Sequence, residues 1–225
     1  MQYGGLSLQG TYHDKNQDSF LSCCFDNGYI LAVSDGLGSK KNSKIGSQCL
    51  CESVLELVQT NIKFDDAKEY LEKLHSIWCK KLSNEKIFEC YCTALICVVT
   101  SDKIFVARLG DGFVALITDS ECVALFDKKE EYFANETDCM LEDFYFEQWE
   151  YKIMENSGFK GAIACTDGVG INPNTEDGYV DFTHDFIEGY IGGSAEDTNK
   201  DIFAWLSEWP GNDDKTIGYI IRDEV

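Results

Sequence analysis

The sequence predicts an α+β fold, a layered sandwich of antiparallel β-sheets and helices, rather than a doubly wound sheet. Two observations lead to this prediction. Strand-like runs outnumber helical ones, and they follow one another as meanders instead of alternating with helices. The 225 residues include no linker rich in Pro or Ser, and 44% of them are hydrophobic, which is enough for a sizeable core. We therefore expect one domain over residues 1–225, with two or three helices covering the sheets.

A hairpin is predicted near the N-terminus. The strand-like run 21–25 is followed by an Asp-Asn-Gly turn signal and then by the apolar run 29–34. If the two runs pair, the polar residues before the first strand lie close to those after the second. We therefore expect His13, Asp18 and Asp35 to be neighbours.

The rest of the chain supplies the helices and the remaining strands. Ser43 is the predicted N-cap of a helix over 44–60. Asp65 or Asp66 is expected to cap a second helix, whose apolar residues recur every three or four positions. The other expected elements are strands at 6–8, 91–100, 104–109, 113–118, 160–165 and 215–221, a helix at 197–209, mixed short pieces at 127–158 and mostly loop at 171–195.

Charge and cysteine content narrow the functional class. The formal net charge of −21 argues against a nucleic acid or an anionic membrane as partner. The 11 cysteines are odd in number and show no Cys-x-x-Cys spacing, which makes a zinc ribbon a poor fit. The start Met-Gln-Tyr-Gly-Gly does not resemble a signal peptide, so a disulfide scaffold is not expected. No run of 18 apolar residues occurs, so no membrane span is expected. We expect a cytoplasmic monomer with reduced thiols.

Acidic turns recur at the ends of strand-like runs. A carboxylate at a strand end is held at the rim of the sheet, and a following glycine lets the backbone approach whatever the carboxylate binds. One Asp-Gly pair after a strand is usually only a turn, so the recurrence is what indicates a site. The positions are Asp35-Gly36, Asp111-Gly112, Asp167-Gly168 and Asp213-Asp214.

Such carboxylates favour a particular chemistry. When brought together they repel one another, and a hard divalent cation such as Mg²⁺ or Mn²⁺ relieves the repulsion. Two such ions about 4 Å apart can share a carboxylate and activate a bridging water for in-line attack on phosphorus. The sequence has neither a Walker loop nor a Gly-x-Ser-x-Gly elbow. Purely structural roles remain as alternatives to binding. Asp111 would then be a hairpin residue without metal, His13 a plain turn residue, and Asp14, Lys15 and Asp214 solvated charges.

Six short motifs, in order along residues 10–221, resemble those of the metal-dependent Ser/Thr protein phosphatases of type 2C, the PPM family. The His, Gln-Asp and Asp-Gly-x-Gly-Ser pattern is similar to a bacterial branch of that family. The motifs are His13-x-x-Asn-Gln-Asp-Ser19, Val33-Ser-Asp-Gly-Leu-Gly-Ser39, Thr93-Ala-Leu, Leu109-Gly-Asp-Gly112, Cys165-Thr-Asp-Gly168 and Asp213-Asp-Lys-Thr216.

The resemblance implies a fold and an activity. The fold would be a four-layer αββα sandwich, in which helices flank two antiparallel sheets and the metals lie in a channel at one sheet end. The activity would be hydrolysis of phosphoserine and phosphothreonine in a protein substrate, by a hydroxide that two Mg²⁺ or Mn²⁺ ions activate. A cognate Ser/Thr kinase would be the other partner.

The resemblance also implies roles for single residues. Asp35 would bridge the two metals, and Gly36 would offer its carbonyl to the second. Asp167 and Asp213 would complete the shell of the first. Asp18 would support it directly or by orienting bound water. A third, weaker ion would lie where Asp111 stands.

Three departures from the family pattern bear on activity. Gln17 replaces the usual Glu, so that it and Asn16 are expected to act only outside the metal shell or through water. His13 replaces the phosphate-binding Arg; it can donate a hydrogen bond to phosphate, and charge when protonated, but lacks the bidentate fork of Arg. Leu37 replaces a His that is a candidate general acid. The alternative function is therefore a weakly active or inactive regulatory module that binds a phosphoprotein. Ca²⁺ binding is a third and weaker alternative, because the sequence contains no Asp-x-Asp-x-Asp-Gly loop.

Overall fold

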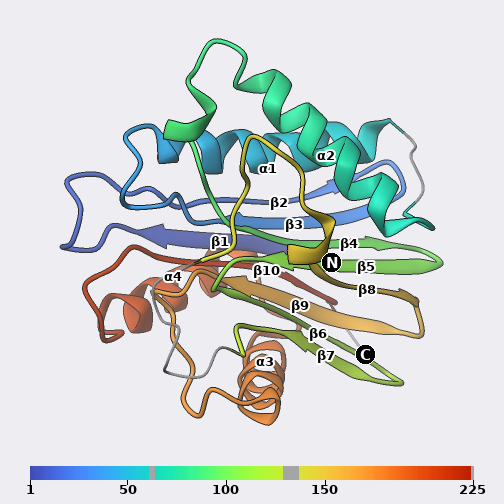
Figure 1. The fold of residues 1–225 in the computed structure, drawn as a ribbon. Coiled ribbons are helices and arrows are strands. Elements are labelled where there is room, and N and C mark those ends of the chain that lie inside the picture. The colour runs from blue at the N-terminus through green and yellow to red at the C-terminus, as the bar shows by residue number, and fades with distance from the viewer. Residues whose placement is uncertain (61–63, 129–136, 224–225) are drawn as a thin grey trace.

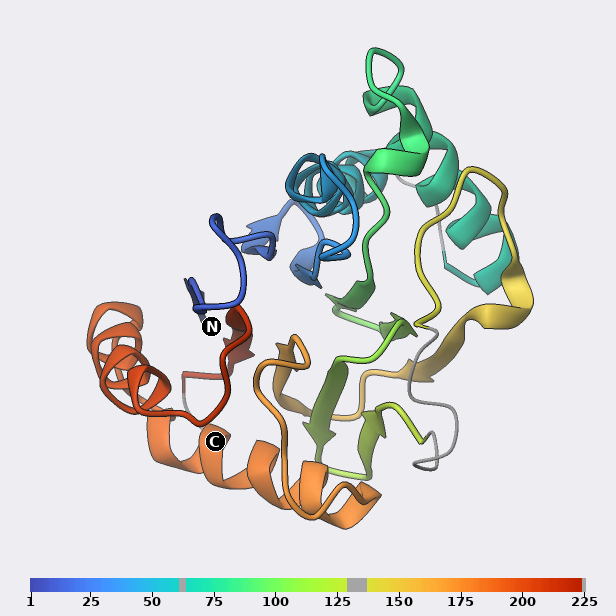
Figure 2. The ribbon, with the colours of Figure 1, turned by 60° about the vertical axis from the view of Figure 1, so that its left-hand side comes forward.

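The computed structural model describes residues 1–60, 64–128 and 137–223, and it shows four layers (Figure 1). Two five-stranded sheets pack face to face, and a pair of helices covers the outer face of each sheet. From a second direction the two helix pairs again lie on opposite sides of the sheets (Figure 2). The predicted αββα sandwich of the α+β class is confirmed.

Each sheet is antiparallel throughout its described ladder, and the first and last strands of the chain pair with each other. In spatial order the first sheet consists of β1 (Gln2–Leu8), β10 (Lys215–Ile221), β9 (Phe159–Cys165), β6 (Phe113–Thr118) and β7 (Cys122–Leu125). The second consists of β2 (Ser19–Phe25), β3 (Gly28–Ser34), β4 (Ala94–Thr100), β5 (Lys103–Leu109) and β8 (Glu150–Glu155).

The helices separate into two pairs because each pair buries its apolar face on a different sheet. The helices α1 (Ser43–Gln59) and α2 (Ala67–Lys81) pack on the second sheet, and α3 (Glu176–Tyr190) and α4 (Ala195–Ser207) on the first. Short 3₁₀ turns lie at Ile87–Glu89 and Phe146–Gln148. None of the described helices is long and apolar enough to cross a lipid bilayer.

The two sheets pack closely through side chains that are completely buried. Leu31 and Val33 of β3 and Ile220 of β10 have no exposed surface. A Cβ added at Gly218 of β10 would lie 2.6 Å from Cδ1 of Leu31. The glycine therefore lets the sheets approach to a distance that any side chain at this position would prevent.

The predicted N-terminal hairpin is confirmed, with a register that matters for the site. Phe25 pairs with Gly28 at the turn, and Ser19 pairs with Ser34 at the open end. Asp18 and Asp35 are the next residues beyond that last pair, so both stand at the same end of the hairpin.

The expectation of mostly loop at residues 171–195 is wrong, because α3 fills most of that range. Glycines and Thr lower its intrinsic helix propensity, which hides the helix in the sequence. The side chain of Thr175 accepts a hydrogen bond from the Gly178 N–H at 3.2 Å and caps the helix. Tyr179 and Phe186 are buried against the sheet, and this packing stabilises the helix.

Two smaller expectations also change. Ser43 is not an N-cap: Asn42 occupies that position, and the buried hydroxyl of Ser43 has no partner in the described parts of the chain. The strand β7 was not predicted. Asp66 does cap α2, accepting the Glu69 N–H at 3.1 Å. Of the mixed region predicted at 127–158, residues 129–136 lie outside the described structure, and β8 forms its main element.

Candidate metal centre

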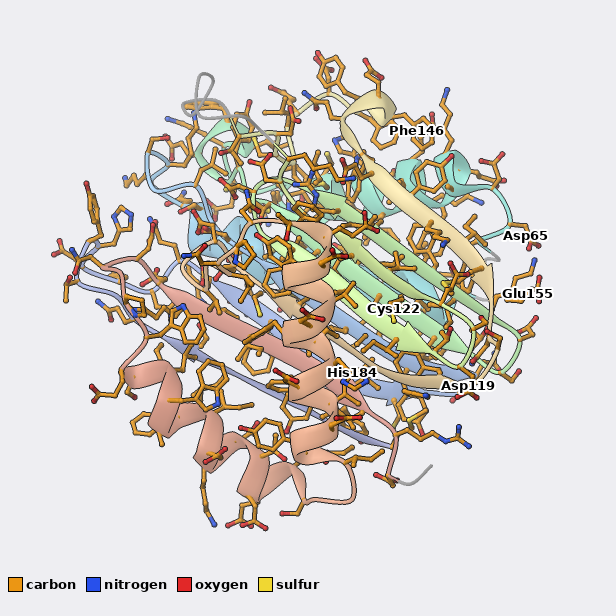
Figure 3. All side chains as sticks on the ribbon, turned by 90° about the horizontal axis from the view of Figure 1, so that it is seen from below. Asp65, Asp119, Cys122, Phe146, Glu155 and His184 are labelled. Carbon is orange, nitrogen blue, oxygen red and sulfur yellow. The ribbon has the colours of Figure 1, made fainter. Side chains whose placement is uncertain are left out.

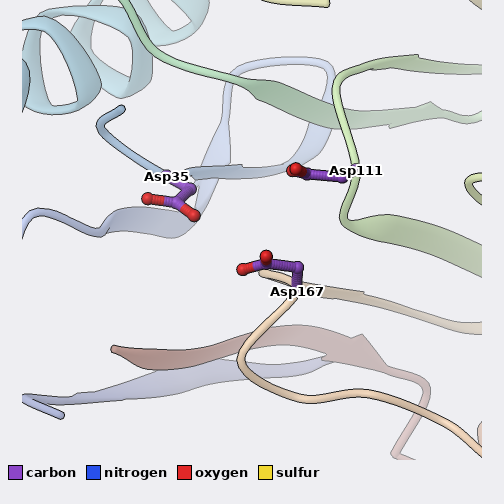
Figure 4. A group of neighbouring side chains, drawn as sticks. All are labelled: Asp35, Asp111 and Asp167. Atoms are coloured by element: carbon purple, nitrogen blue, oxygen red, sulfur yellow. The ribbon is translucent and has the colours of Figure 1, made fainter. Parts of the chain in front are cut away.

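Three carboxylates from both sheets meet at one end of the sandwich. Asp35 follows β3, Asp111 lies in the turn from β5 to β6, and Asp167 follows β9. One carboxylate oxygen from each of the three lies within 4.8 Å of the others, and the side chains face a common space (Figure 4). Strand ends that are far apart in the sequence thus place acidic oxygens together, as the recurring turns predicted.

The backbone around Asp35 is fixed by the start of β4. Its N–H donates to Oγ1 of Thr93 at 2.9 Å, and its carbonyl accepts the Thr93 N–H at 2.8 Å. The hydroxyl of Ser34 donates to the Thr93 carbonyl at 2.6 Å. A Cβ at Gly36 would lie 2.7 Å from the backbone of Ser43, so only glycine fits after the aspartate. These contacts hold the Asp35 carboxylate at the sheet end.

Asp18 stands at the same end of the hairpin as Asp35 and is almost completely buried, at 1% exposed. One of its carboxylate oxygens, Oδ2, accepts hydrogen bonds from Thr166 at 2.8 Å and from Thr216 at 2.7 Å. The other, Oδ1, is buried and has no hydrogen-bond partner among the described residues. A buried carboxylate oxygen without a donor is costly, and it marks a place for a cation or an ordered water.

Burial and mutual repulsion raise the pKa values of three carboxyls in and beside the cluster. Burial, followed by repulsion from Asp18 and Asp167, raises the pKa of Asp35 well above its usual range. Burial also raises the pKa of Asp18 to about 6. Asp167 keeps exposed surface, yet the burial of its carboxyl, followed by the charges of Asp111 and Asp213, raises its pKa to about 7. The raised pKa values of Asp18, Asp35 and Asp167 mean that negative charge is disfavoured here without a cation, and the all-oxygen donor set suits Mg²⁺ or Mn²⁺.

The remaining acidic candidates differ in their surroundings. Asp111 accepts a hydrogen bond from the hydroxyl of Thr137 at 2.7 Å through Oδ2. Asp213 is half-buried and lies outside the group of three, although its charge contributes to the raised pKa of Asp167. Its Oδ1 accepts the N–H of Asp214 at 2.9 Å. Asp213 therefore stands beside the cluster rather than within it.

The residues of the N-terminal loop divide between structural contacts and the site. Asn16 uses its side chain locally, donating to Ser7 at 2.8 Å and accepting the Asp18 N–H at 2.9 Å. The main chain of Gln17 is anchored, since its carbonyl accepts the hydroxyl of Ser47 at 2.7 Å. His13 is half-buried, and a Cβ at Gly38 would lie 2.6 Å from its Nε2. The imidazole thus rests on the glycine loop that follows Asp35.

Asp214 is not the solvated charge that the sequence suggested. It is only 4% exposed, and its two carboxylate oxygens accept the N–H groups of Gly10 at 2.8 Å and Gln17 at 2.7 Å. The loop that carries His13 is therefore tied at both ends to the residue after Asp213. No sequence motif distinguished this role from that of an exposed acidic turn. Thr93, Thr166 and Thr216 were part of the motifs, but their hydrogen bonds could not be foreseen.

Replacing Asp214 with Ala should destabilise the protein by about 1–3 kcal/mol, because two N–H groups lose a charged acceptor in a largely buried place. Urea unfolding of the two proteins measures the difference. Asp14→Ala serves as the control, since Asp14 is exposed and should change stability by less than about 0.5 kcal/mol. Equal stabilities for Asp214→Ala and the parent would contradict this role.

Solved structures share this arrangement of sheets and helices, and several of them are bacterial phosphatases. A bacterial serine phosphatase has a TM-score of 0.68 and 15% identity, and the match covers 100% of this chain and 99% of that one. The serine/threonine phosphatase Stp1 from Staphylococcus aureus has a TM-score of 0.70 and 15% identity, and the match covers 97% of this chain and 94% of that one. The serine/threonine phosphatase PstP/Ppp from Mycobacterium tuberculosis has a TM-score of 0.66 and 13% identity, and the match covers 98% of each chain. At such identities the likeness establishes the fold.

A model of the protein phosphatase 2C family matches residues 11–207. The chain therefore belongs to the protein phosphatase 2C family. Among curated proteins, no sequence gives a significant match.

Proposed function

We propose that this protein hydrolyses phosphoserine and phosphothreonine in a phosphoprotein, using Mg²⁺ or Mn²⁺ held by the carboxylates at the end of the sandwich. One observation carries the proposal: Asp35, Asp111 and Asp167 present oxygens within 4.8 Å of one another, and the buried Asp18 at the same hairpin end has an oxygen with no hydrogen-bond partner among the described residues. Family membership sets the reaction class, and the carboxylate cluster supports its metal dependence.

Each residue of the centre has a distinct part in this proposal. Asp35 would be a ligand of two ions, and the Gly36 carbonyl would be a further ligand of the second. Asp167 would hold the first ion together with Asp213, which stands beside the cluster, and Asp111 with Asp167 would offer a weaker third position. When bound, the ions would supply a water that is acidic near neutral pH and positive charge for the phosphate oxygens. The chain itself fixes the oxygens in advance through Thr93, Thr166 and Thr216, so little reorganisation is needed when the ions bind.

The assay that tests the function is hydrolysis of a phosphothreonine peptide, followed by release of inorganic phosphate. We expect turnover with Mn²⁺ and none above background after treatment with EDTA, with recovery when Mn²⁺ is restored. Turnover that is the same with and without chelator would refute a metal-dependent mechanism.

We assign contact with the substrate phosphate to His13. Its ring lies against Gly38, in the loop that follows Asp35. We infer that the imidazole can reach a phosphate bound at the carboxylate cluster. The side chain of Asn16 is engaged with Ser7 and Asp18. Gln17 is anchored through its main chain, and its side-chain Oε1 faces the same glycine as His13, 3.7 Å from a Cβ placed at Gly38.

Gly38→Ala should raise KM for the phosphopeptide several-fold while leaving the thermal midpoint almost unchanged. The new methyl group would displace the end of the His13 ring, which can move aside without disturbing the core. His13→Ala should raise KM by a similar factor, and the double variant should be no worse than either single one. Additive effects of the two changes would show that Gly38 does not act through His13.

A second candidate function is a module that binds a phosphoprotein and regulates signalling with little turnover. Gln17, His13 and Leu37, which replace residues typical of the family, favour it. Calorimetry with Mn²⁺ together with the phosphate-release assay separates the two functions. Binding of metal without turnover would support the module, whereas turnover of the phosphopeptide would support the enzyme.

A further inference from the structure

A groove of about 310 Å³ lies between α3 and α4, on the helical face opposite α1 and α2. Figure 3 looks onto this face, with α3 in front and His184 marked on it. The residues that line the groove are aromatic or acidic, apart from one glycine. They are Phe182, Asp185, Phe186, Gly189, Tyr190, Asp201, Trp205 and Trp209.

The aromatic side chains form a continuous wall. Ring centroids are 4.9 Å apart for Phe186 and Tyr190, 5.4 Å for Trp205 and Trp209, and 6.1 Å for Phe182 and Trp209. All but Phe186 are half-buried, so one part of each ring packs on the sheet while another part faces the groove. Five aromatic rings therefore line a space that stays open to a ligand.

Hydrogen bonds fix the polar edges of this wall. The Tyr190 hydroxyl donates to Oδ2 of Asp201 at 2.5 Å, and Nε1 of Trp205 donates to the Tyr190 oxygen at 3.1 Å. This chain of bonds joins α3 to α4 and holds three of the groove residues in place. The groove is thus organised before any ligand binds, which lowers the entropic cost of binding.

The charge of the groove is negative and is not neutralised by the described part of the chain. Asp185 and Asp201 are exposed, and neither forms an ion pair with a described basic residue. The basic side chains of these helices are engaged elsewhere: His184 lies 3.4 Å from Glu188, and Lys200 lies 2.8 Å from Glu196. Aromatic rings and carboxylates that have no described basic partner attract an organic cation through two independent interactions.

Gly189 leaves the groove open. It lies within α3, and a Cβ added there would meet no heavy atom within 4 Å. Glycine inside a helix costs about 0.5–1 kcal/mol relative to Ala. A side chain at this position would stabilise the helix and at the same time project into the groove.

We propose that the groove binds an arginine-bearing segment of a partner protein. A guanidinium group can stack on an indole or phenol ring while it pairs with a carboxylate, and the apolar residues of the segment can cover the remaining ring surface. Lysine offers a point charge without a flat face to stack, so arginine fits these residues better. The groove is built from α3 and α4 and does not use the carboxylates of the metal centre, so this inference is independent of the proposed phosphatase activity.

The probe is a peptide with blocked, uncharged termini in which two arginines flank a leucine. Its control has citrulline in place of both arginines. We expect the indole NMR signals of Trp205 and Trp209 to shift on titration with the arginine peptide, with those of Trp78 and Trp149 unchanged. Citrulline keeps the shape but not the charge, so its peptide should bind at least about tenfold more weakly. Equal affinity for the two peptides would overturn the proposal.

Two variants locate the binding and remain informative if one of them misfolds. Gly189→Leu should lower the affinity for the arginine peptide at least about tenfold, without lowering the thermal midpoint. Asp185→Asn, which breaks no described contact, should lower it several-fold and reduce its dependence on salt. Phe203→Ala is the control, since Phe203 is 55% exposed on α4 and does not line the groove. Unchanged affinity in both groove variants, or an equal loss in Phe203→Ala, would place the binding elsewhere.

Discussion

Asp35→Asn is expected to lower the turnover of a phosphothreonine peptide with Mn²⁺ by about 10³-fold. Asp35 contributes an oxygen to the group that it forms with Asp111 and Asp167, and the amide of Asn offers one neutral oxygen where the carboxylate offers two charged ones. If Asp35 is the proposed ligand of both ions, its loss would remove several kcal/mol of charge stabilisation from the reacting phosphate, and each 1.36 kcal/mol corresponds to a factor of about ten in rate.

The same substitution has an opposite effect on the metal-free protein, which separates its role from misfolding. Because burial and the charges of Asp18 and Asp167 disfavour the Asp35 carboxylate, a neutral Asn should raise the thermal midpoint without metal. It should also remove most of the stabilisation that Mn²⁺ gives to the parent protein. Differential scanning calorimetry with and without Mn²⁺ measures both effects. A variant that is inactive, less stable without metal and still stabilised by Mn²⁺ would contradict the bridging role.

The metal-free protein should lose stability as the pH rises from about 4 to about 7. The carboxyl of Asp167 titrates near 3.8 in a free chain, but its pKa is about 7 in the folded protein. Asp18, with a pKa of about 6, shifts in the same direction. Between these values the folded state binds more protons than the unfolded state, so the free energy of unfolding falls as the pH increases.

Urea unfolding of the metal-free protein at a series of pH values tests this dependence. Asp167→Asn is the matched variant, and its stability should fall less steeply over the same range because one of the raised pKa values is gone. Added Mn²⁺ should reverse the trend, since the metal competes with protons for the same oxygens and binds better at higher pH. Parallel pH profiles for the parent and Asp167→Asn would show that Asp167 does not titrate as described.

Local pattern was enough to predict the sandwich and much of its acidic centre. The turn before Gly28 set the hairpin register, and this register placed Asp18 and Asp35 at one end. Each Asp-Gly turn was visible as a strand end. The recurrence of these turns indicated a site, and the family resemblance implied which residues share it. That Asp111 and Asp167 meet Asp35 depends on how the two sheets pack, which no local pattern determines.

The sequence failed where tertiary contacts outweigh local preference. The glycines of α3 suggested a loop, but burial of Tyr179 and Phe186 on the first sheet outweighs their helix-breaking tendency. Asp214 looked like a surface charge, although two N–H groups from a loop about 200 residues earlier in the chain surround it. Its role follows from the pairing of the first and last strands, which is a property of the whole fold.

The hydrogen bonds of Asp18 to Thr166 and Thr216 join positions that are 148 and 198 residues apart in the sequence. Contacts of such long sequence separation form only after most of the chain has ordered, because closing a large loop costs conformational entropy that local contacts do not repay. The carboxylate cluster therefore forms only in the fully folded chain, and a nascent or partly unfolded chain cannot assemble it. Any chemistry that depends on this cluster is restricted to molecules in which the first and last strands have already paired.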